Sequence, residues 1–379
     1  MSIGLSSEKS REQIAKAKRI VVKIGSSSLT GSAGSFLDEK AVNALVDLVV
    51  GARDRGAEVA VVSSGAIAAG LAPLGLKARP KDLATQQAAA SVGQGLLIHR
   101  YTESLARHHV TASQVLLTTQ DIVRREHYQN AQRTIDKLLS LGVVPIINEN
   151  DSVGTQEIRF GDNDRLAALV SMLIGADLLI LVSDIDALYD APPSTPGAKR
   201  ISNVESLSEI DESTLGGSGS AGVGSGGIIT KVEAARIATG AGIATLLTTL
   251  AEAPNAVVGK DFGTYFQAQS SKNNSRMLWL AHASTPHGRL ILDDGAVTAV
   301  LERGVSLLPA GVTSVEGEFS AGDAVELASK SGKVIARGLV AFDSAEIPQM
   351  LGRSTKELAK ELGPEYEREL VHRDDLVLL

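Results

Sequence analysis

The segment IVVKIGS, residues 20–26, is an apolar run that contains one charged side chain. Four of the five residues at 20–24 are Ile or Val, and they do not alternate with polar residues. A continuous apolar run of this length is typical of a strand buried on both faces, as in a parallel sheet covered by helices. An unpaired buried ammonium group is strongly unfavourable. We therefore expect Lys23 to lie near the strand's end, facing an anion or paired with a carboxylate.

Similar apolar segments alternate with longer segments of helical period in the residues that follow. The predicted strands are 57–65, 111–118, 143–150 and 177–184, and the predicted helices are 37–56, 82–110, 125–142 and 163–176. We expect 82–110 to be helical apart from its two glycines. Such alternation implies right-handed crossovers between parallel strands, with helices on both faces of the sheet. The sequence therefore predicts an α/β domain with a mostly parallel sheet sandwiched by helices.

The residues that end the predicted strands are small, polar or acidic. They read Gly25-Ser26-Ser27, Ser63-Ser64-Gly65, Asn148-Glu149-Asn150-Asp151 and Ser183-Asp184. Ligands of open parallel sheets bind at the carboxyl ends of the strands. The ordinary polarity of loops would explain any one of these ends. Four polar strand ends at the same edge of the sheet favour a ligand-binding site there.

The size and composition of the chain limit its class. A length of 379 residues suggests two domains, and the absence of cysteine excludes disulfides and thiolate metal sites. No apolar run reaches the roughly 18 residues of a membrane span, and the polar N-terminal extension, 1–17, is unlike a secretory signal. These features favour the cytoplasm and no membrane partner. The net charge of −7 argues against broad binding to nucleic acids.

A change in composition near residues 270–285 suggests a domain boundary. Beyond it, 288–342 consists of short segments separated by Gly, Asp-Gly and Ser-Gly-Lys at the spacing of hairpins. The predicted organisation is an α/β domain at 1–270, a linker at 271–287 and a small β-rich domain at 288–379.

The most glycine-rich stretch, GSGSAGVGSGGIITK (217–231), runs directly into a helical pattern. It lacks the Gly-Lys pair of a Walker A loop, so it is not a P-loop. Consecutive glycines still let backbone N–H groups approach an anion, and the helix directs its positive end to the same place. Lys231 adds a point charge suited to a phosphate. A flexible Gly/Ser linker is the alternative interpretation.

The third unusual stretch is acidic. Residues 148–170 include Glu149, Asp151, Glu157, Asp162 and Asp164. Helix capping would explain one residue of Asp162-Asn163-Asp164, but carboxylates so close together need a cation or a lysine nearby. Mg²⁺ held by one or two carboxylates and by substrate phosphates meets that need. Two lysines, a glycine-rich loop, a helix N-terminus and this acidic cluster together indicate phosphoryl transfer.

On these residues the chain resembles the glutamate 5-kinases, members of the amino-acid kinase family that carry a C-terminal PUA domain. The matching stretches are VVKIGSSSLT (21–30), VVSSGAIAAG (61–70), ASVGQGLL (90–97), VVPIINEND (143–151), GDND (161–164), SGGIITK (225–231), GTYF (263–266) and VLERGVSLLP (300–309). The chain departs from the pattern at Ser63 and Ser183, where Thr is common, and at Ile228, where Met is common.

The resemblance implies transfer of the ATP γ-phosphoryl group to the side-chain carboxylate of L-glutamate, the first step of proline biosynthesis. It also implies the following roles: catalysis by Lys23, Lys231 and Asp164; glutamate binding by Ser64, Asp151 and Asn163; nucleotide binding by Lys23, Ser183, Asp184, Ser225, Gly226, Gly227, Ile228, Ile229, Thr230 and Lys231; and Mg²⁺ binding by Asp162 with Asp164. Asp164 is expected to hold the two lysines in place, and Asp151 to take the substrate ammonium.

The resemblance further implies feedback inhibition by proline and assembly into dimers or tetramers. The resemblance also suggests glutamyl phosphate reductase as a physical partner, because glutamyl phosphate is labile. PUA-like domains elsewhere bind RNA, but this one has few aromatic residues and many acids among its basic ones, so RNA binding is not favoured. Two alternatives stay open: an RNA-binding or regulatory protein with a vestigial kinase domain, and a related amino-acid kinase that acts on another small acid.

Overall fold

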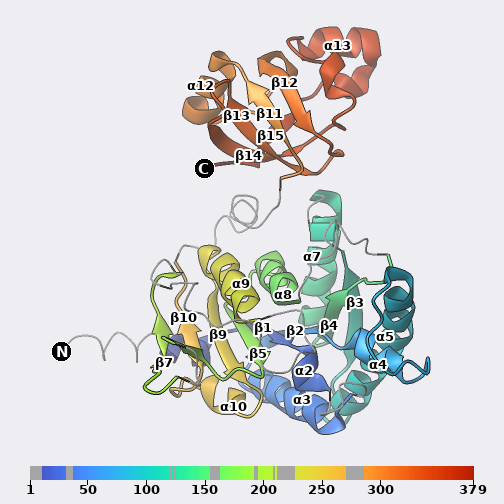
Figure 1. Ribbon diagram of the computed structural model, residues 1–379, viewed down its shortest axis with the longest axis vertical. Helices are drawn as coiled ribbons and strands as arrows, with labels where there is room; N and C mark the ends of the chain where they lie inside the picture. The colour runs from blue at the N-terminus through green and yellow to red at the C-terminus, as the bar shows by residue number, and fades with distance from the viewer. Residues whose placement is uncertain are drawn as a thin grey trace, which may run out of the picture. The chain divides into compact units, whose positions relative to one another are not determined.

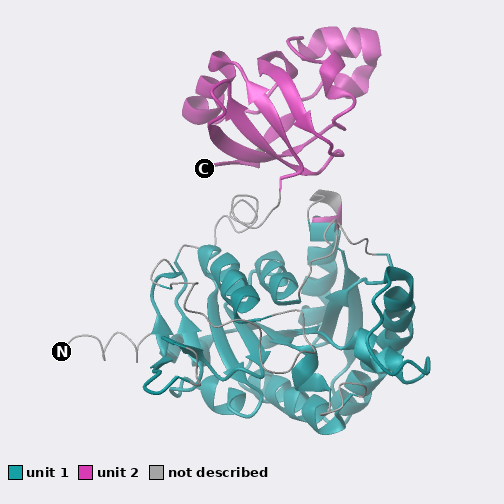
Figure 2. Ribbon diagram, viewed as in Figure 1, with its two compact units in different colours: residues 1–122, 129–273 teal, residues 123–128, 274–379 magenta. Residues whose placement is uncertain are grey.

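The computed structural model describes residues 11–30, 37–118, 121–122, 125–153, 163–191, 195–207, 210, 227–269 and 286–379. The chain forms two compact units (Figure 2). The first comprises residues 1–122 and 129–273, and the second comprises residues 123–128 and 274–379. The predicted linker, 271–287, lies almost entirely outside the described residues.

The first unit is built on one large sheet. Its strands are, in spatial order, β3 (Ala112–Leu117), β4 (Val144–Glu149), β2 (Glu58–Ser63), β1 (Arg19–Ile24), β5 (Leu178–Ser183), β9 (Ala244–Thr249), β10 (Thr264–Phe266) and β8 (Asn203–Val204). Neighbouring strands are parallel except for β9 and β10, which are antiparallel. A short antiparallel pair, β6 (Leu188–Tyr189) and β7 (Arg200–Ile201), lies outside this sheet.

Helices cover the sheet, with α8 and α9 on one face and α3 on the other (Figure 1). The helices described in this unit are α2 (Ser26–Leu29), α3 (Glu39–Asp54), α4 (Ala66–Leu71), α5 (Leu83–Ala106), α7 (Arg125–Ser140, from residue 129 onward), α8 (Asn163–Leu173), α9 (Ile228–Gly240) and α10 (Ala253–Ala256). The predicted fold class is confirmed, and each strand and helix predicted between residues 20 and 184 is present.

The central strands explain why the sequence shows continuous apolar runs. Every residue of β4 and β5 is buried, and five of the six residues in β1 are buried. β1 lies between β2 and β5, so both of its edges are paired and both of its faces are covered. Among its buried residues, 20–24, only Lys23 is charged, and it lies one residue before the strand ends.

Helix α5 differs from the prediction, because it continues through Gly93 and Gly95 without interruption. Glycine is unfavourable inside a helix by about 1 kcal/mol relative to alanine. The structure gives a reason for Gly93: a Cβ there would lie 1.7 Å from the carbonyl oxygen of Ala66 in α4. A Cβ on Gly70 of α4 would lie 1.9 Å from the Ala89 carbonyl oxygen. The two helices therefore cross with their backbones in contact.

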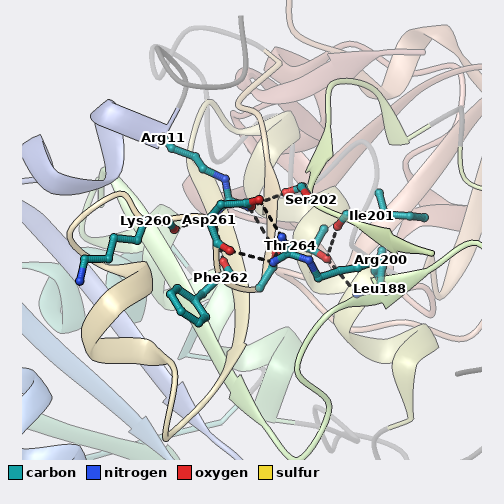
Figure 3. A network of polar contacts seen from close by, with 10 residues as sticks. Arg11, Leu188, Arg200, Ile201, Ser202, Lys260, Asp261, Phe262 and Thr264 are labelled. Atoms are coloured by element: carbon teal, nitrogen blue, oxygen red, sulfur yellow. Dashed lines mark hydrogen bonds and ion pairs between the residues drawn. The ribbon is translucent and has the colours of Figure 1, made fainter. Parts of the chain in front are cut away.

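The N-terminal extension is anchored through Arg11, a buried residue in the helical segment 11–16. Its guanidinium donates to the carbonyl oxygens of Ser202 at 2.6 Å, Phe262 at 2.9 Å and Lys260 at 3.0 Å (Figure 3). It also pairs with Asp261 at 3.1 Å. A single side chain thus joins the start of the chain to the loops beside β8 and β10.

The second unit contains a five-stranded sheet in the order β12 (Val312–Gly317), β11 (Gly288–Leu292), β13 (Ala324–Ser329), β14 (Val334–Val340) and β15 (Val371–Leu378). Helices α12 (Asp294–Arg303) and α13 (Thr355–Leu362) lie in the same unit. The β-rich prediction is confirmed, and Ser-Gly-Lys at 331–333 does join the antiparallel strands β13 and β14.

One predicted turn in this unit is wrong. Asp294-Gly295 lies in the first turn of α12, because the Asp293 side chain caps that helix by accepting from the Ala296 amide at 2.7 Å. An aspartate before a helix start and an Asp-Gly turn have similar local sequences, and the cap prevails here. No described helix combines the length and apolar character needed to cross a membrane.

Candidate active site

Two lysines that are far apart in the sequence meet at one carboxylate. Lys23, near the end of β1, pairs with Oδ1 of Asp164, which lies in the first turn of α8. Lys231, in the first turn of α9, pairs with Oδ2 of Asp164 at 3.1 Å. All three side chains are buried, with at most 6% of the side-chain surface exposed. We call this group the lysine–aspartate cluster (Lys23, Asp164 and Lys231).

The cluster carries a net positive charge within the fold. Burial raises the pKa of Asp164, but the ammonium groups of Lys23 and Lys231 lower it more, and the outcome is a pKa of about 2. Asp164 is therefore ionised at neutral pH, and it offsets one of the two ammonium charges. Two ammonium groups that share one carboxylate make this position suited to an anion.

Three strand ends meet beside the cluster. The amide of Gly25 donates to the Val182 carbonyl oxygen at 3.4 Å, and the amide of Ser64 donates to the Ile24 carbonyl oxygen at 3.1 Å. A Cβ on Gly25 would lie 3.8 Å from Nζ of Lys23, so the ammonium group lies close to this loop. The carboxyl edges of β1, β2 and β5 thus form the border of the site, as the sequence predicted.

The glycine-rich segment reaches the cluster through the start of α9. Gly227 is the N-cap of this helix, and Ile228, Ile229, Thr230 and Lys231 form its first turn. Thr230 Oγ1 lies 3.0 Å from Oδ2 of Asp164, to which it donates. Ser225 and Gly226, which were predicted to contact the nucleotide, lie outside the described residues. The described part of the segment is therefore a helix start and not a linker.

A second group of polar side chains adjoins the first. Asn163 Nδ2 lies 3.0 Å from the carbonyl oxygen of Ser63, 2.9 Å from Oγ of Ser64 and 3.0 Å from Oδ1 of Asn148. We call these four residues the amide–hydroxyl cluster (Ser63, Ser64, Asn148 and Asn163). Because Asn163 and Asp164 are consecutive in α8, the start of one helix holds both clusters together.

The other predicted site residues lie at neighbouring strand ends. Ser183 Oγ donates to Oδ1 of Asp184 at 3.0 Å, just beyond β5. Asp151 lies in the turn that follows β4. These positions fit the predicted edge of the sheet.

The predicted Mg²⁺ site is only partly described. Both carboxylate oxygens of Asp164 face ammonium groups, which would repel a cation, so Asp164 does not fit as a direct metal ligand. Asp162, the other predicted ligand, lies outside the described residues. Among the residues that are described, no three His, Asp or Glu side chains are grouped to hold a metal ion.

Sequence reasoning missed the support behind the amide–hydroxyl cluster. Tyr101 of α5 is fully buried, and its hydroxyl lies 2.9 Å from Oγ of Ser63. Gln94, also on α5, donates to the Glu149 carbonyl oxygen at 3.4 Å. The spacing of Tyr101 with Leu97 and Leu105 marks an apolar helix face, but it does not show which residue the hydroxyl would meet.

Two protein-family models match the sequence of this chain. Residues 18–248 match the amino acid kinase family, and residues 288–362 match the PUA domain. The chain belongs to the amino acid kinase family. Among solved structures, a carbamate kinase from Giardia lamblia bound to AMP-PNP is similar, with a TM-score of 0.49 and 16% identity over 67% of this chain and 100% of that one.

Within the family, several curated proteins similar to this chain carry the name glutamate 5-kinase. Glutamate 5-kinase of Streptomyces avermitilis is 61% identical over 97% of this chain and 98% of its own. Glutamate 5-kinase of Streptomyces coelicolor is 60% identical over the same shares, and that of Thermobifida fusca is 57% identical over 100% of this chain and 97% of its own. The chain is a member of the glutamate 5-kinase family.

Proposed function

We propose that this protein transfers the γ-phosphoryl group of ATP to the side-chain carboxylate of L-glutamate, giving L-glutamyl 5-phosphate and ADP. The observation that supports this most is the convergence of Lys23 and Lys231 on Asp164 at the carboxyl edge of the sheet. Its membership of the glutamate 5-kinase family supports the choice of substrate.

The reaction needs no strong general base. A glutamate side chain has an ordinary pKa of about 4.3, so its carboxylate is already ionised at neutral pH and can attack phosphorus directly. The obstacle is repulsion between this carboxylate and the negatively charged triphosphate. Catalysis therefore depends on positioning the reactants and on offsetting charge, and both can be supplied by fixed cations and N–H donors.

We assign charge neutralisation to the two lysines. Asp164 holds both ammonium groups, so they need not reorganise when charge develops on the transferring phosphoryl group. The start of α9 brings backbone N–H groups and the positive end of the helix dipole to the same position. In this proposal Asp164 is a positioning residue, and Lys23 and Lys231 contact the reacting phosphate.

We assign glutamate binding to Ser64, Asn163 and Asp151, with Asp151 taking the substrate ammonium. Ser183, Asp184 and residues 225–231 are proposed to bind the nucleotide. The adjacency of Asn163 and Asp164 would place the acceptor beside the transferring phosphoryl group. Mg²⁺ would enter on the phosphates of ATP, with Asp162 as its proposed protein ligand.

A substrate panel tests the proposal. ADP release should be measured with ATP, Mg²⁺ and each of several acceptors: L-glutamate, D-glutamate, L-aspartate, N-acetyl-L-glutamate and UMP. Hydroxylamine should trap the acyl phosphate as a hydroxamate. We expect hydroxamate only with L-glutamate. ADP release that exceeds the buffer control with another acceptor, but not with L-glutamate, would show that the substrate assignment is wrong.

The lysine assignment is tested with Lys23→Met and Lys231→Met. Each change removes a charge that acts on the transition state, so we expect kcat to fall by about 10²- to 10³-fold with a much smaller change in KM. Lys16→Met is a matched control, because Lys16 is 75% exposed and pairs only across one helical turn with Glu12 among the contacts described. A near-normal kcat in either active-site variant would remove that lysine from catalysis.

Several finer properties remain proposals. Inhibition by proline, assembly into dimers or tetramers and association with glutamyl phosphate reductase follow from the family resemblance, and RNA binding by the PUA domain is not favoured. Two basic residues of the PUA domain are held by one carboxylate: Arg289 pairs with Glu326 at 2.8 Å, and Arg337 pairs with it at 3.6 Å. Their charges are partly offset, which lowers their attraction for a phosphate backbone.

A further inference from the structure

A buried tyrosine contacts the amide–hydroxyl cluster. Tyr101 of α5 and Ser63 at the end of β2 are both fully buried, and their hydroxyl oxygens are 2.9 Å apart. Ser63 is the residue whose carbonyl oxygen faces Asn163, and the next residue, Ser64, faces Asn163 through its side chain. Tyr101 is thus connected through Ser63 to Asn163, whose side-chain amide is proposed to bind glutamate.

The direction of the Tyr101–Ser63 hydrogen bond follows from the available acceptors. Ser63 Oγ lies 3.0 Å from the Ser64 carbonyl oxygen, which can only accept. If Ser63 donates there, the Tyr101 hydroxyl donates to Ser63, and both hydrogens have an acceptor. If Ser63 instead donated to Tyr101, the buried hydroxyl hydrogen of Tyr101 would have neither Ser63 Oγ nor the Ser64 carbonyl oxygen as its acceptor. A buried donor without an acceptor is unfavourable. Burial also raises the pKa of Tyr101, although its bond to Ser63 partly opposes this, so the phenol keeps its proton.

We infer that Tyr101 is a positioning residue for the acceptor substrate. Its hydroxyl fixes the rotamer of Ser63, and the Ser63 side chain in turn holds the carbonyl oxygen of Ser64, in the peptide between Ser64 and Gly65. The backbone of Ser63 and Ser64 is thus held by these two bonds, and it carries the Ser63 carbonyl oxygen and the Ser64 side chain, both of which orient Asn163. This inference rests on the proposed function, because it assigns the amide–hydroxyl cluster to the acceptor.

A purely structural role makes a different prediction. Tyr101 belongs to the hydrophobic core of the first unit, so its ring packs in that core whatever its hydroxyl does. If the hydroxyl served stability alone, its removal would lower the melting temperature without separating the two substrates. A positioning role instead requires a specific rise in the KM for the acceptor.

The test is Tyr101→Phe, which keeps the ring and deletes the hydroxyl. We expect KM for L-glutamate to rise by about three- to tenfold, as for the loss of one hydrogen bond, while KM for ATP stays within about twofold. Tyr265→Phe is the matched control. Tyr265 is a fully buried tyrosine of β10 whose hydroxyl has no hydrogen-bond partner among the described residues, so its removal should leave both KM values unchanged.

Variants at Ser63 complete a double-mutant cycle with Tyr101→Phe. Ser63→Thr keeps the hydroxyl and should keep a near-normal KM for glutamate, whereas Ser63→Ala should raise it as Tyr101→Phe does. The double variant should resemble the more affected single variant, because both changes break the same connection. If Tyr101→Phe does not fold, the Ser63 pair carries the test.

The outcomes separate this inference from the proposed function. Equal changes in the two KM values, or no change relative to Tyr265→Phe, would overturn the positioning role while leaving glutamate as the substrate. If the wild-type protein phosphorylates a different acid, the proposed function fails. The same comparison of KM values with that acid then decides the role of Tyr101.

Discussion

Strand β1 carries a basic side chain near each end, and the two ends differ in their surroundings. At the amino end, Arg19 pairs with Glu58 at 2.7 Å and with Asp136 at 2.8 Å. These three side chains are 28%, 37% and 40% exposed. Near the carboxyl end, the side chains of Lys23 and Asp164 are 4% and 0% exposed. The same strand therefore holds one half-exposed ion network and one buried one.

From this difference we infer that the Arg19 network serves the fold and that the lysine–aspartate cluster serves the proposed chemistry. Arg19 also donates to the Ile174 carbonyl oxygen at 2.6 Å, so it joins β1 and β2 to α7 and to the residues after α8 with little desolvation. A buried ion pair gives little net stability, because removing its charges from water offsets their attraction. The lysine–aspartate cluster is therefore poorly explained by stability, and a role in offsetting the charge of a ligand explains it better.

The largest expected effect is that of Asp164→Asn. This change removes the carboxylate that the two buried ammonium groups of Lys23 and Lys231 both face, so we expect the unfolding free energy to fall by about 3–5 kcal/mol. We also expect kcat to fall by at least about a hundredfold, because the lysines lose their orientation. Denaturant titration and steady-state kinetics measure the two effects.

Asp136→Asn at the amino end is the matched change, and it should lower stability by less than about 1 kcal/mol. Equal losses from the two substitutions would contradict the distinction between a buried and a half-exposed network.

The second effect is a dependence of stability on acid. The pKa of Asp164 is lowered from 3.8 to about 2 in the folded state. The stabilisation is fully present above pH 4, and it is lost as the pH falls toward 2, because the unfolded chain binds the proton first. The loss is about 2 kcal/mol. Unfolding free energies of the wild type and Asp164→Asn should therefore converge by this amount between pH 4 and pH 2. Parallel curves would show that the lysines do not hold this carboxylate in its ionised form.

A smaller effect than that of Asp164→Asn is expected for Arg19→Gln. It should lower the unfolding free energy by about 1–2 kcal/mol, since half-exposed ion pairs and a carbonyl contact are lost together. It should leave kcat and both KM values unchanged, because the amino edge of the sheet is remote from the proposed chemistry. A fall in kcat comparable to that of the lysine variants would show that Arg19 also affects catalysis, and would contradict the distinction between the two ends of β1.

Much of the first unit could be predicted from local sequence. The continuous Val and Ile runs of β1 and β5 identify buried parallel strands, and their carboxyl ends had to share an edge of the sheet. The placement of Lys23 and Lys231 at that edge was therefore predictable. The role of Asp164 came from the family resemblance, and the structure places its carboxylate between the two ammonium groups.

The rest depends on contacts between distant segments. Gly93 resembles a helix breaker until α4 is placed against it, and Asp293 resembles part of a turn until its side chain caps α12. The hydroxyl of Tyr101 has no local signal, because its partner Ser63 lies in another element. Such tertiary contacts determine features that helix and strand propensity and hydrophobic periodicity do not predict.

The anchoring of Arg11 has a consequence for the order in which the protein is made. Arg11 leaves the ribosome well before two of its carbonyl partners, which lie 249 and 251 residues later in the chain. During synthesis the contact with Ser202 can form first, whereas the contacts with the loop before β10 must wait until that loop has emerged. The full set of Arg11 contacts therefore becomes possible only once the chain has been made through residue 263.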